Sequence, residues 1–259
     1  MANEIKDLSA ILEKLGIENL NKMQVTATSV IPKSSETMLL SPTGSGKTLA
    51  FLLPVVEALN PEISEIQTLI IVPSRELAIQ IDQVAREMGT GYKVNAFYGG
   101  RSFNKDRMDL KHPPAILIGT PGRIADHLRR TTFSTEKIKT LILDEFDKSL
   151  EIGFESEMTE IVNALPSVDK KILTSATFGV DVPEFMGMNN IKVLDFLGEG
   201  ESFLEVKLIQ SPDKDKLNTL LDLLKGIAGE PGIIFCNYKD TIRFISDFLY
   251  DNEIPHGCF

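Results

Sequence analysis

The side chains best suited to chemistry lie in one short segment, Ser41-Pro-Thr-Gly-Ser-Gly-Lys-Thr48. Gly44 and Gly46 let backbone N–H groups turn toward an anion, because glycine adopts left-handed conformations at little cost. Lys47 adds a full positive charge, and the hydroxyl of Thr48 is an oxygen ligand that suits Mg²⁺. This spacing is typical of a loop that holds the phosphates of a nucleotide.

The flanking residues support the same interpretation. The apolar run Met38-Leu39-Leu40 predicts a buried strand, and a helical pattern extends over 47–59. A strand, a loop and the positive N-terminus of a helix form the context in which such a motif binds phosphate. The departure from the motif is at its first position, where Ser41 replaces glycine.

A pair of carboxylates, Asp144 and Glu145, directly follows a second apolar run at 141–143. Together with the loop, this pair predicts a protein that binds and splits a nucleoside triphosphate.

Short β-branched runs alternate with helical patterns, which predicts an α/β fold with a mostly parallel sheet wrapped by helices. Such sheets bind ligands at the carboxyl ends of their strands, so we expect the loop, the carboxylates and Ser175-Ala-Thr177 to gather at one edge. The expected strands are 37–40, 68–72, 93–98, 115–118, 140–143, 171–174 and 191–196. The expected helices are 4–15, 47–59, 74–88, 122–129 and 154–164.

The same patterns predict two domains. Residues 1–197 hold the first set of strands and helices, and the acidic, glycine-containing stretch 198–203 is typical of a linker. A new cycle follows in 204–259, which is shorter than the ~100 residues of an ordinary α/β domain, so we expect the opening portion of a second domain. Its expected strands are 204–210 and 232–236, and its expected helices are 213–225 and 239–252.

Composition narrows the class of protein. The 259 residues carry a formal net charge of −10, which disfavours a broad basic footprint for nucleic acid but allows binding through backbone N–H groups and a few arginines.

The sequence shows no apolar run of ~18 residues and no signal-peptide pattern, so we expect a cytoplasmic protein without membrane contact. Cys236 and Cys258 form no CxxC pair and the three histidines form no ligand cluster, so neither a disulfide framework nor a zinc site is indicated. A monomer is the default expectation.

Three further segments follow expected strands: Pro73–Gln80, Gly99-Gly100 and Thr120-Pro-Gly-Arg123. Each places a helix N-terminus or a bare glycine backbone at a strand end, and such groups suit sugar-phosphate oxygens. Arg75 and Arg123 add positive charge at two of them. Taken singly, each segment also has a plainer explanation as a helix start or a loop.

In their order and spacing, these segments closely resemble the motifs of the DEAD-box family of ATP-dependent RNA helicases. The resemblance covers nearly the whole chain and implies a RecA-like domain followed by the start of a second one. It also implies a core that binds ATP, Mg²⁺ and RNA, and couples ATP hydrolysis to unwinding or remodelling of RNA duplexes. The similar segments are Gly16…Gln24, Ser41–Thr48, Pro73–Gln80, Gly99-Gly100, Thr120–Arg123, Asp144-Glu-Phe-Asp147, Ser175-Ala-Thr177 and Ile233–Asn237.

The resemblance implies a role for each matching residue. Gln24 would read the edge of adenine, Glu145 would activate the attacking water, and Asp144 would orient Mg²⁺, partly through water. The phosphates and the metal would also be held by Thr43, Gly44, Ser45, Gly46, Lys47 and Thr48. Coupling to domain closure would involve Asp147, Ser175 and Thr177. The RNA backbone would be contacted, with little sequence specificity, by Pro73, Arg75, Gly99, Gly100, Thr120, Gly122 and Arg123.

The sequence departs from the family pattern at several positions. Phe146 stands where the family's name has alanine, Leu20 and Lys22 occupy positions where prolines are usual, and Phe51 is the first aromatic residue, so the adenine-stacking aromatic is absent. The sequence also contains neither Ala-Arg-Gly-x-Asp nor His-Arg-x-Gly-Arg-x-Gly-Arg, the motifs that would supply arginine fingers. Arginine fingers contribute roughly 10³–10⁵ in rate, so we expect these residues alone to bind nucleotide weakly and hydrolyse it poorly.

Two other functions stay open on the sequence. A phosphate-loop ATPase that acts on DNA or protein fits the loop, although 73–80 and 120–123 argue against it. The other alternative is a non-catalytic, nucleotide-regulated RNA-binding module. Such a protein would function without the arginine motifs. Stimulation of ATP hydrolysis by RNA rather than DNA distinguishes the helicase from the first alternative.

Overall fold

The computed structural model describes residues 7–177, 179–198, 206–212, 214, 216–227 and 230–258. The chain divides into two compact units, Met1–Glu201 and Ser202–Phe259, each of which is described by itself. Residues 199–203 of the expected linker lie outside the described residues, as do 4–6 of the first expected helix and 204–205 of the expected strand 204–210.

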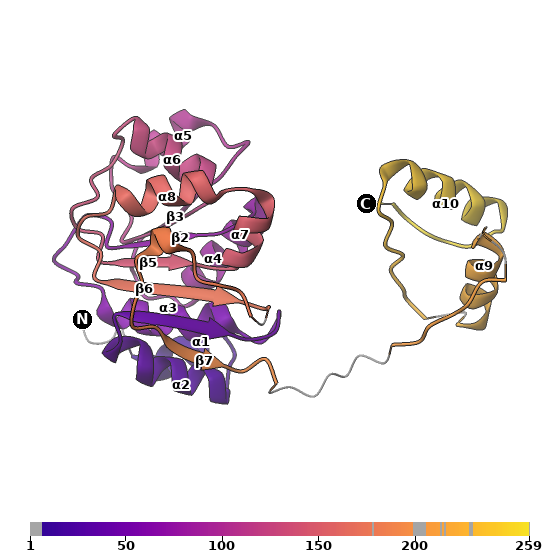
Figure 1. The fold of residues 1–259 in the computed structure, drawn as a ribbon, viewed down its shortest axis with the longest axis horizontal. Helices are drawn as coiled ribbons and strands as arrows, with labels where there is room; N and C mark the ends of the chain where they lie inside the picture. Colours follow the sequence, from indigo (N-terminus) through magenta and orange to yellow (C-terminus); the bar gives the residue numbers. More distant parts are fainter. Residues whose placement is uncertain are drawn as a thin grey trace. The chain divides into compact units, whose positions relative to one another are not determined.

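The first unit is built on a parallel sheet whose described strands run in the order β3-β4-β2-β5-β6-β1-β7, and every described strand pair is parallel. This arrangement confirms the expected α/β class and parallel sheet (Figure 1). The strands are β1 (Glu36–Leu40), β2 (Thr68–Ile71), β3 (Val94–Phe97), β4 (Ile116–Gly119), β5 (Thr140–Leu143), β6 (Lys170–Ser175) and β7 (Lys192–Asp195).

Helices cover both faces of this sheet (Figure 1). Successive strand residues point to opposite faces, so Leu39 packs in a core cluster with α1–α4, whereas Met38 and Leu40 pack in a second cluster with α6–α8. The helices of the first unit are α1 (Leu8–Lys14), α2 (Lys22–Val30), α3 (Lys47–Ala58), α4 (Arg75–Glu87), α5 (Phe103–Asp109), α6 (Pro121–Arg129), α7 (Phe146–Ile152) and α8 (Glu155–Asn163), with 3₁₀ turns at η1 (Ile31–Lys33) and η2 (Glu184–Met186).

Three of these helices, α2, α5 and α7, are not predicted by the sequence patterns. α2 has little amphipathic character and contains β-branched residues, but a reciprocal capping box between Asn21 and Gln24 starts it. α5 and α7 are short, and α7 follows a left-handed residue, Glu145, directly after a strand. Phe146 begins α7 and is fully buried in the second core cluster, so the larger side chain is accommodated by packing.

The second unit contains α9 (Leu217–Gly226) and α10 (Lys239–Asp251) among its described residues. The strand expected at 232–236, and the described part 206–210 of the other, are not strands, which corrects that prediction. A strand requires backbone hydrogen bonds to a neighbouring strand, and β-branched composition alone does not supply them. Leu208 is 99% exposed and Phe235 is 90% exposed, and Cys236 is half-buried rather than packed in a strand.

No helix in the described part of the chain combines the length and the apolar character that a membrane span requires.

Candidate functional site

The order of the strands brings the expected nucleotide residues together. The phosphate loop follows β1, the acidic pair follows β5, and β6, which ends at Ser175, lies between these two strands. All three strands are parallel, so their carboxyl ends meet at one edge of the sheet. A hollow of about 330 Å³ at this edge is lined by Leu15, Ile17, Gln24, Thr43, Gly44, Gly46, Lys47, Thr48, Leu49, Leu77, Gln80, Val84, Asp144 and Glu145.

Two glycines shape the phosphate loop. Gly44 has φ +78° and Gly46 has φ +89°, both in the left-handed region that side chains other than glycine rarely adopt. A Cβ at Gly46 would lie 2.6 Å from Nε2 of Gln24, so space as well as conformation demands glycine there. α3 begins at the next residue, so its positive N-terminus faces the loop.

Lys47 lies over the loop and is only 8% exposed. Its Nζ donates hydrogen bonds to the carbonyl oxygens of Ser41 at 2.6 Å and Pro42 at 2.9 Å. Burial lowers the pKa of Lys47, and the negative charges of Asp144 and Glu145 oppose that shift. A desolvated ammonium held in place by carbonyls gains strongly from a nearby anion, which is the property that a phosphate-binding lysine needs.

Ser41 fits the first motif position without strain. It is not among the residues with positive φ, and it is buried. Its N–H donates to the carbonyl of Ser175 at 3.1 Å, and its Oγ donates to Oγ of Ser45 at 2.7 Å. The serine that replaces glycine thus adds a hydrogen bond across the loop.

Gln24 links α2 to the loop. Its Oε1 accepts a hydrogen bond from N of Asn21 at 3.0 Å, and its Nε2 donates to the carbonyl of Gly46 at 3.4 Å. The Nδ2 of Asn21 donates to the carbonyl of Ser45 at 3.0 Å. Gln24 therefore lines the hollow while both ends of its amide contact the protein, and Asn21 is a loop contact that the sequence reasoning missed.

The acidic pair differs in its surroundings. Asp144 is 3% exposed, and burial raises its pKa from 3.8 to about 6, a shift that a hydrogen bond from Thr174 opposes. Glu145 is half-buried and has φ 49° and ψ 49°, an unusual backbone conformation for a residue with a side chain. The Oγ1 of Thr174 donates to Oδ1 of Asp144 and accepts from N of Glu145 at 3.1 Å.

The hydroxyl that contacts Asp144 and Glu145 is therefore that of Thr174, the residue directly before Ser175-Ala-Thr177. The Oγ of Ser175 accepts from N of Thr177 at 2.9 Å, and neither carboxylate oxygen of the buried Asp147 has a hydrogen-bond partner. The physical reason is strand alternation: Ile142 and Ile172 face α3, and Leu143 and Leu173 face the other layer, so the next residues, Asp144 and Thr174, face α3 again.

The residues at this edge fit Mg²⁺. The hydroxyl of Thr48 and the carboxylate of Asp144 line the same hollow, and both are hard oxygen ligands. No three His, Cys, Asp or Glu side chains gather as a metal cluster within the described ranges. Mg²⁺ is usually held by one or two carboxylates together with phosphates and waters, and this donor set matches that pattern.

The residues expected to contact RNA follow the other half of the sheet. Pro73 and Arg75 come after β2, Gly99 and Gly100 after β3, and Thr120, Gly122 and Arg123 after β4. β3, β4 and β2 are neighbours, and β2 also pairs with β5. The two expected sites thus lie side by side along one edge, one on each half of the sheet.

These residues differ in how freely they can contact a ligand. Gly99 and Gly100 are exposed, and a Cβ added at either glycine would meet no atom within 4 Å. The side chain of Arg75 is 58% exposed. Arg123 instead turns inward and is 13% exposed. Its guanidinium donates to Oδ2 of Asp106 at 2.6 and 2.8 Å and to the carbonyl of Arg101 at 2.9 Å.

Asp106 is the centre of a buried charge cluster on α5 that the sequence reasoning missed. It is fully buried and also contacts Nε of Arg101 at 3.2 Å and Nε2 of His127 at 3.1 Å. His127 stacks on Phe103 with ring centroids 4.3 Å apart. The cluster joins α5 to α6 and to Arg101, the residue that follows Gly99-Gly100, so Arg123 supports the position of this segment.

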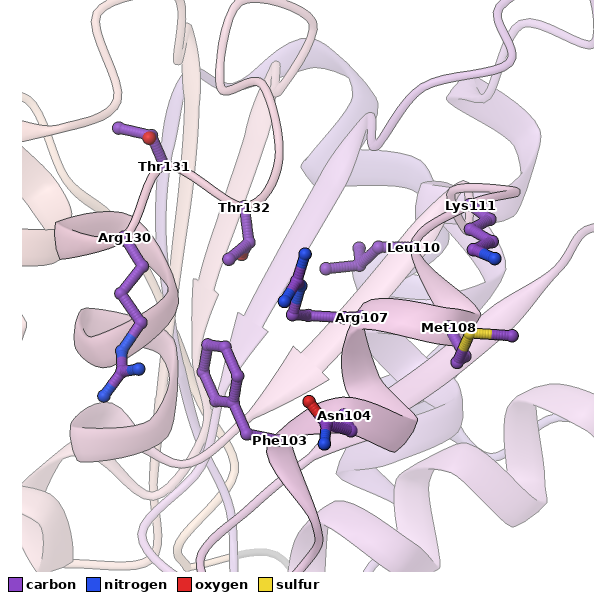
Figure 2. Close-up of a pocket in the computed structure, with 9 residues that line it drawn as sticks. All are labelled: Phe103, Asn104, Arg107, Met108, Leu110, Lys111, Arg130, Thr131 and Thr132. Carbon is purple, nitrogen blue, oxygen red and sulfur yellow. The ribbon is translucent and has the colours of Figure 1, made fainter.

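A second hollow, of about 950 Å³, lies between α5 and the end of α6. Figure 2 shows Phe103 and Arg107 from α5 together with Arg130, Thr131 and Thr132 from the segment after α6. It shares no lining residue with the hollow at Lys47, so it is separate from the nucleotide residues.

Comparisons with known proteins agree with this geometry. A family model described as DEAD/DEAH box helicase matches residues 21–185. The chain is 31% identical to the ATP-dependent RNA helicase DbpA of Bacillus subtilis over 96% of this chain and 53% of that protein. It is 31% identical to the ATP-dependent RNA helicase eIF4A of Mycosarcoma maydis over 92% of this chain and 60% of that protein.

Solved structures show the same fold. A DEAD box protein from Methanococcus jannaschii superposes with a TM-score of 0.65 at 27% identity, over 93% of this chain and 67% of that chain. A hypothetical ATP-dependent RNA helicase from Sulfolobus tokodaii has a TM-score of 0.64 at 24% identity, over 74% of this chain and 57% of that chain, which supports the fold alone. The chain spans about half the length of the curated relatives it matches.

Proposed function

Because the chain belongs to the DEAD/DEAH box helicase family, we propose that it forms the nucleotide-binding part of an ATP-dependent RNA helicase. It binds ATP with Mg²⁺ and single-stranded RNA, and ATP hydrolysis drives the remodelling of RNA duplexes. The observation that carries this proposal is the convergence of Gln24, Lys47, Thr48, Asp144 and Glu145 on one hollow at the sheet edge.

The residues that line the hollow have different roles in this proposal. The loop N–H groups and Lys47 hold the phosphates, and the N-terminus of α3 adds partial positive charge. Glu145, which is half-buried, positions the attacking water and accepts its proton. Gln24 contacts the loop and faces the same hollow, so it orients the adenine end relative to the phosphates. When bound through Thr48 and Asp144, Mg²⁺ would neutralise charge on the phosphate oxygens.

RNA contacts come from the neighbouring half of the edge. The exposed backbone at Gly99 and Gly100 and the side chain of Arg75 suit phosphate oxygens, which carry no base identity. We therefore expect little sequence specificity. The proposed RNA surface follows β2, β3 and β4, and β2 pairs with β5, the strand that leads into the acidic pair, so we expect movement at one surface to affect the other.

The test is ATP binding and hydrolysis by the wild type and by Lys47→Ala, with Lys137→Ala as an exposed lysine control. Lys47→Ala should abolish detectable ATP binding while the far-ultraviolet circular dichroism spectrum is unchanged, and Lys137→Ala should match the wild type. ATP affinity that survives in Lys47→Ala would refute the assignment of the phosphate loop.

A second measurement addresses the nucleic acid. ATP hydrolysis is followed with single-stranded RNA and with DNA of the same sequence, in this chain and in any longer natural form. We expect stimulation by RNA only, with slow turnover in these residues alone because the sequence contains no arginine-finger motif. Equal stimulation by DNA would favour a DNA-directed ATPase, and ATP binding without hydrolysis in every form would favour a non-catalytic module.

A further inference from the structure

The hydroxyl of Thr174 lies between the two members of the acidic pair. Its Oγ1 donates a hydrogen bond to Oδ1 of Asp144 and accepts one from N of Glu145 at 3.1 Å. Thr174 is fully buried and is not among the residues that line the nucleotide hollow. Its side chain therefore acts on the site through Asp144 and Glu145 rather than by touching the nucleotide.

The position of this hydroxyl follows from the sheet. Leu143 of β5 is in register with Leu173 of β6, so the next residues, Asp144 and Thr174, are also neighbours. Their side chains return to the face that packs on α3, where the phosphate loop lies. Only a short side chain that both donates and accepts can bridge a carboxylate and an N–H group at this place, and threonine meets that requirement.

The accepted bond matters because the backbone of Glu145 is unusual. Its φ of 49° and ψ of 49° place a residue with a side chain in the left-handed region, which is unfavourable unless the surroundings hold it. The N–H of Glu145 donates a hydrogen bond to Oγ1 of Thr174, and α7 begins at the residue after Glu145. The same hydroxyl thus fixes the carboxylate of one acidic residue and the backbone direction of the other.

We propose that Thr174 is a positioning residue for ATP hydrolysis, which orients Asp144 and Glu145 through one hydroxyl. The proposal rests on the proposed function, because it assumes that this acidic pair acts on ATP. It adds a residue that precedes the Ser175-Ala-Thr177 motif and that no motif predicted.

Two substitutions separate the hydroxyl from the packing of the side chain. Thr174→Val keeps the shape and removes the hydroxyl, whereas Thr174→Ser keeps the hydroxyl and removes a methyl group. Thr37→Val is the matched control, because Thr37 is a buried threonine of the same sheet whose Oγ1 has no hydrogen-bond partner. Each variant is measured for kcat of RNA-stimulated hydrolysis and for the Kd of ATP.

Thr174→Val should lower kcat by about tenfold or more, since misplaced catalytic groups are costly, while the Kd of ATP changes by less than about threefold. Thr174→Ser should recover most of the wild-type kcat, and Thr37→Val should match the wild type. Wild-type kcat in Thr174→Val, or equal losses in the valine and serine variants, would overturn the proposal.

A readout without turnover keeps the test independent of the helicase assignment. Hydrogen exchange at the amide of Glu145 should accelerate by about tenfold or more in Thr174→Val and stay slow in Thr174→Ser. Unchanged exchange in Thr174→Val would also overturn the positioning role. If the wild type and Lys47→Ala bind ATP equally, the proposed function fails. If Lys47→Ala loses ATP binding but Thr174→Val keeps the full kcat, only the role of Thr174 is refuted.

Discussion

Among the single residues of the site, Asp144 lowers the stability of the folded state at neutral pH. Burial raises its pKa from 3.8 to about 6, and the like charge of Glu145 acts in the same direction. A carboxyl whose pKa is higher in the folded state contributes stability that is fully present below pH 3.8 and is lost as the pH rises through about 6. At neutral pH the ionised side chain therefore destabilises the fold, and a bound cation would offset that effect.

Asp144→Asn should consequently stabilise the protein when no metal is present. The amide keeps an oxygen that can accept from Thr174 but carries no charge, so the free energy of unfolding should rise at pH 8 by up to about 3 kcal/mol, at ~1.4 kcal/mol per pKa unit. The gain should shrink toward pH 4. Urea denaturation in EDTA at both pH values measures it, with the exposed Asp181→Asn as control; lower stability of Asp144→Asn at pH 8 would contradict this account.

The residue types of the nucleotide site were predictable, whereas some of their partners were not. The spacing of Gly44, Gly46 and Lys47 after an apolar run was enough to place the loop at a strand end. The contact between Thr174 and Asp144 depends on the register of β5 and β6, which no local pattern contains. The inward turn of Arg123 depends in the same way on Asp106, a residue of a helix that was not predicted.

At the scale of elements, the phosphate loop is held by α2 as well as by its own strand and helix. Asn21 and Gln24, at the start of α2, both donate hydrogen bonds to loop carbonyls. The conformation of the loop therefore responds to the packing of α2, and a change that separates the two should weaken nucleotide binding without unfolding the sheet.

Gly46→Ala makes that change. The new Cβ would meet Nε2 of Gln24 at 2.6 Å in a left-handed backbone conformation, so both the loop and the amide must shift. We expect the affinity for ATP to fall by about tenfold or more, equivalent to ~1.4 kcal/mol, as measured by titration with a fluorescent nucleotide. Gly226→Ala, which meets no atom within 4 Å, is the control; unchanged affinity in Gly46→Ala would show that the loop tolerates the displacement.

The buried cluster on α5 supports a second prediction at this scale. Asp106→Asn removes a fully buried charge that pairs with Arg101 and Arg123, and breaking such a pair costs about 3 kcal/mol or more. Asp126→Asn removes a partly exposed charge paired with Arg130 and should cost clearly less, because solvent screens that pair. Chemical denaturation compares the free energies of unfolding of the two variants. Equal losses of stability would mean that the burial of Asp106 does not make its ion pairs more important for stability.

Elements with a strong period were predictable to within a residue or two, such as α4 and the strands of the first unit. α2 was not, because its stability comes from a capping box and from burial of Met23 and Ala27 rather than from an apolar stripe. The strands expected at 204–210 and 232–236 were wrong where the structure describes them, because an apolar run becomes a strand only beside a hydrogen-bonding partner.

Across the whole molecule, the two units differ in how much core they possess. Buried residues of the first unit form two large clusters, whereas Leu221 and Leu249 are the buried residues in the described part of the second. A cooperative unfolding transition needs a substantial core, so the transition of this chain should be that of the first unit.

A shortened chain of residues 1–198 should therefore melt within about 2 °C of the 259-residue chain, since every residue of the two core clusters remains. A chain of residues 1–190 also loses β7 with the buried Leu194 and Phe196, and should melt at least about 5 °C lower. Differential scanning calorimetry distinguishes them. A large drop for 1–198 would show that the second unit stabilises the first.

The place of β1 in the sheet has a consequence for synthesis of the protein. β1 is the first of the described strands, and it pairs with β6 and β7. On the ribosome, the strand that leads into Lys47 is made before its two partners, and both of its edges await strands translated more than a hundred residues later. The nascent chain must shield an apolar strand through that interval, and we expect no help from a bound nucleotide until almost the entire first unit has emerged.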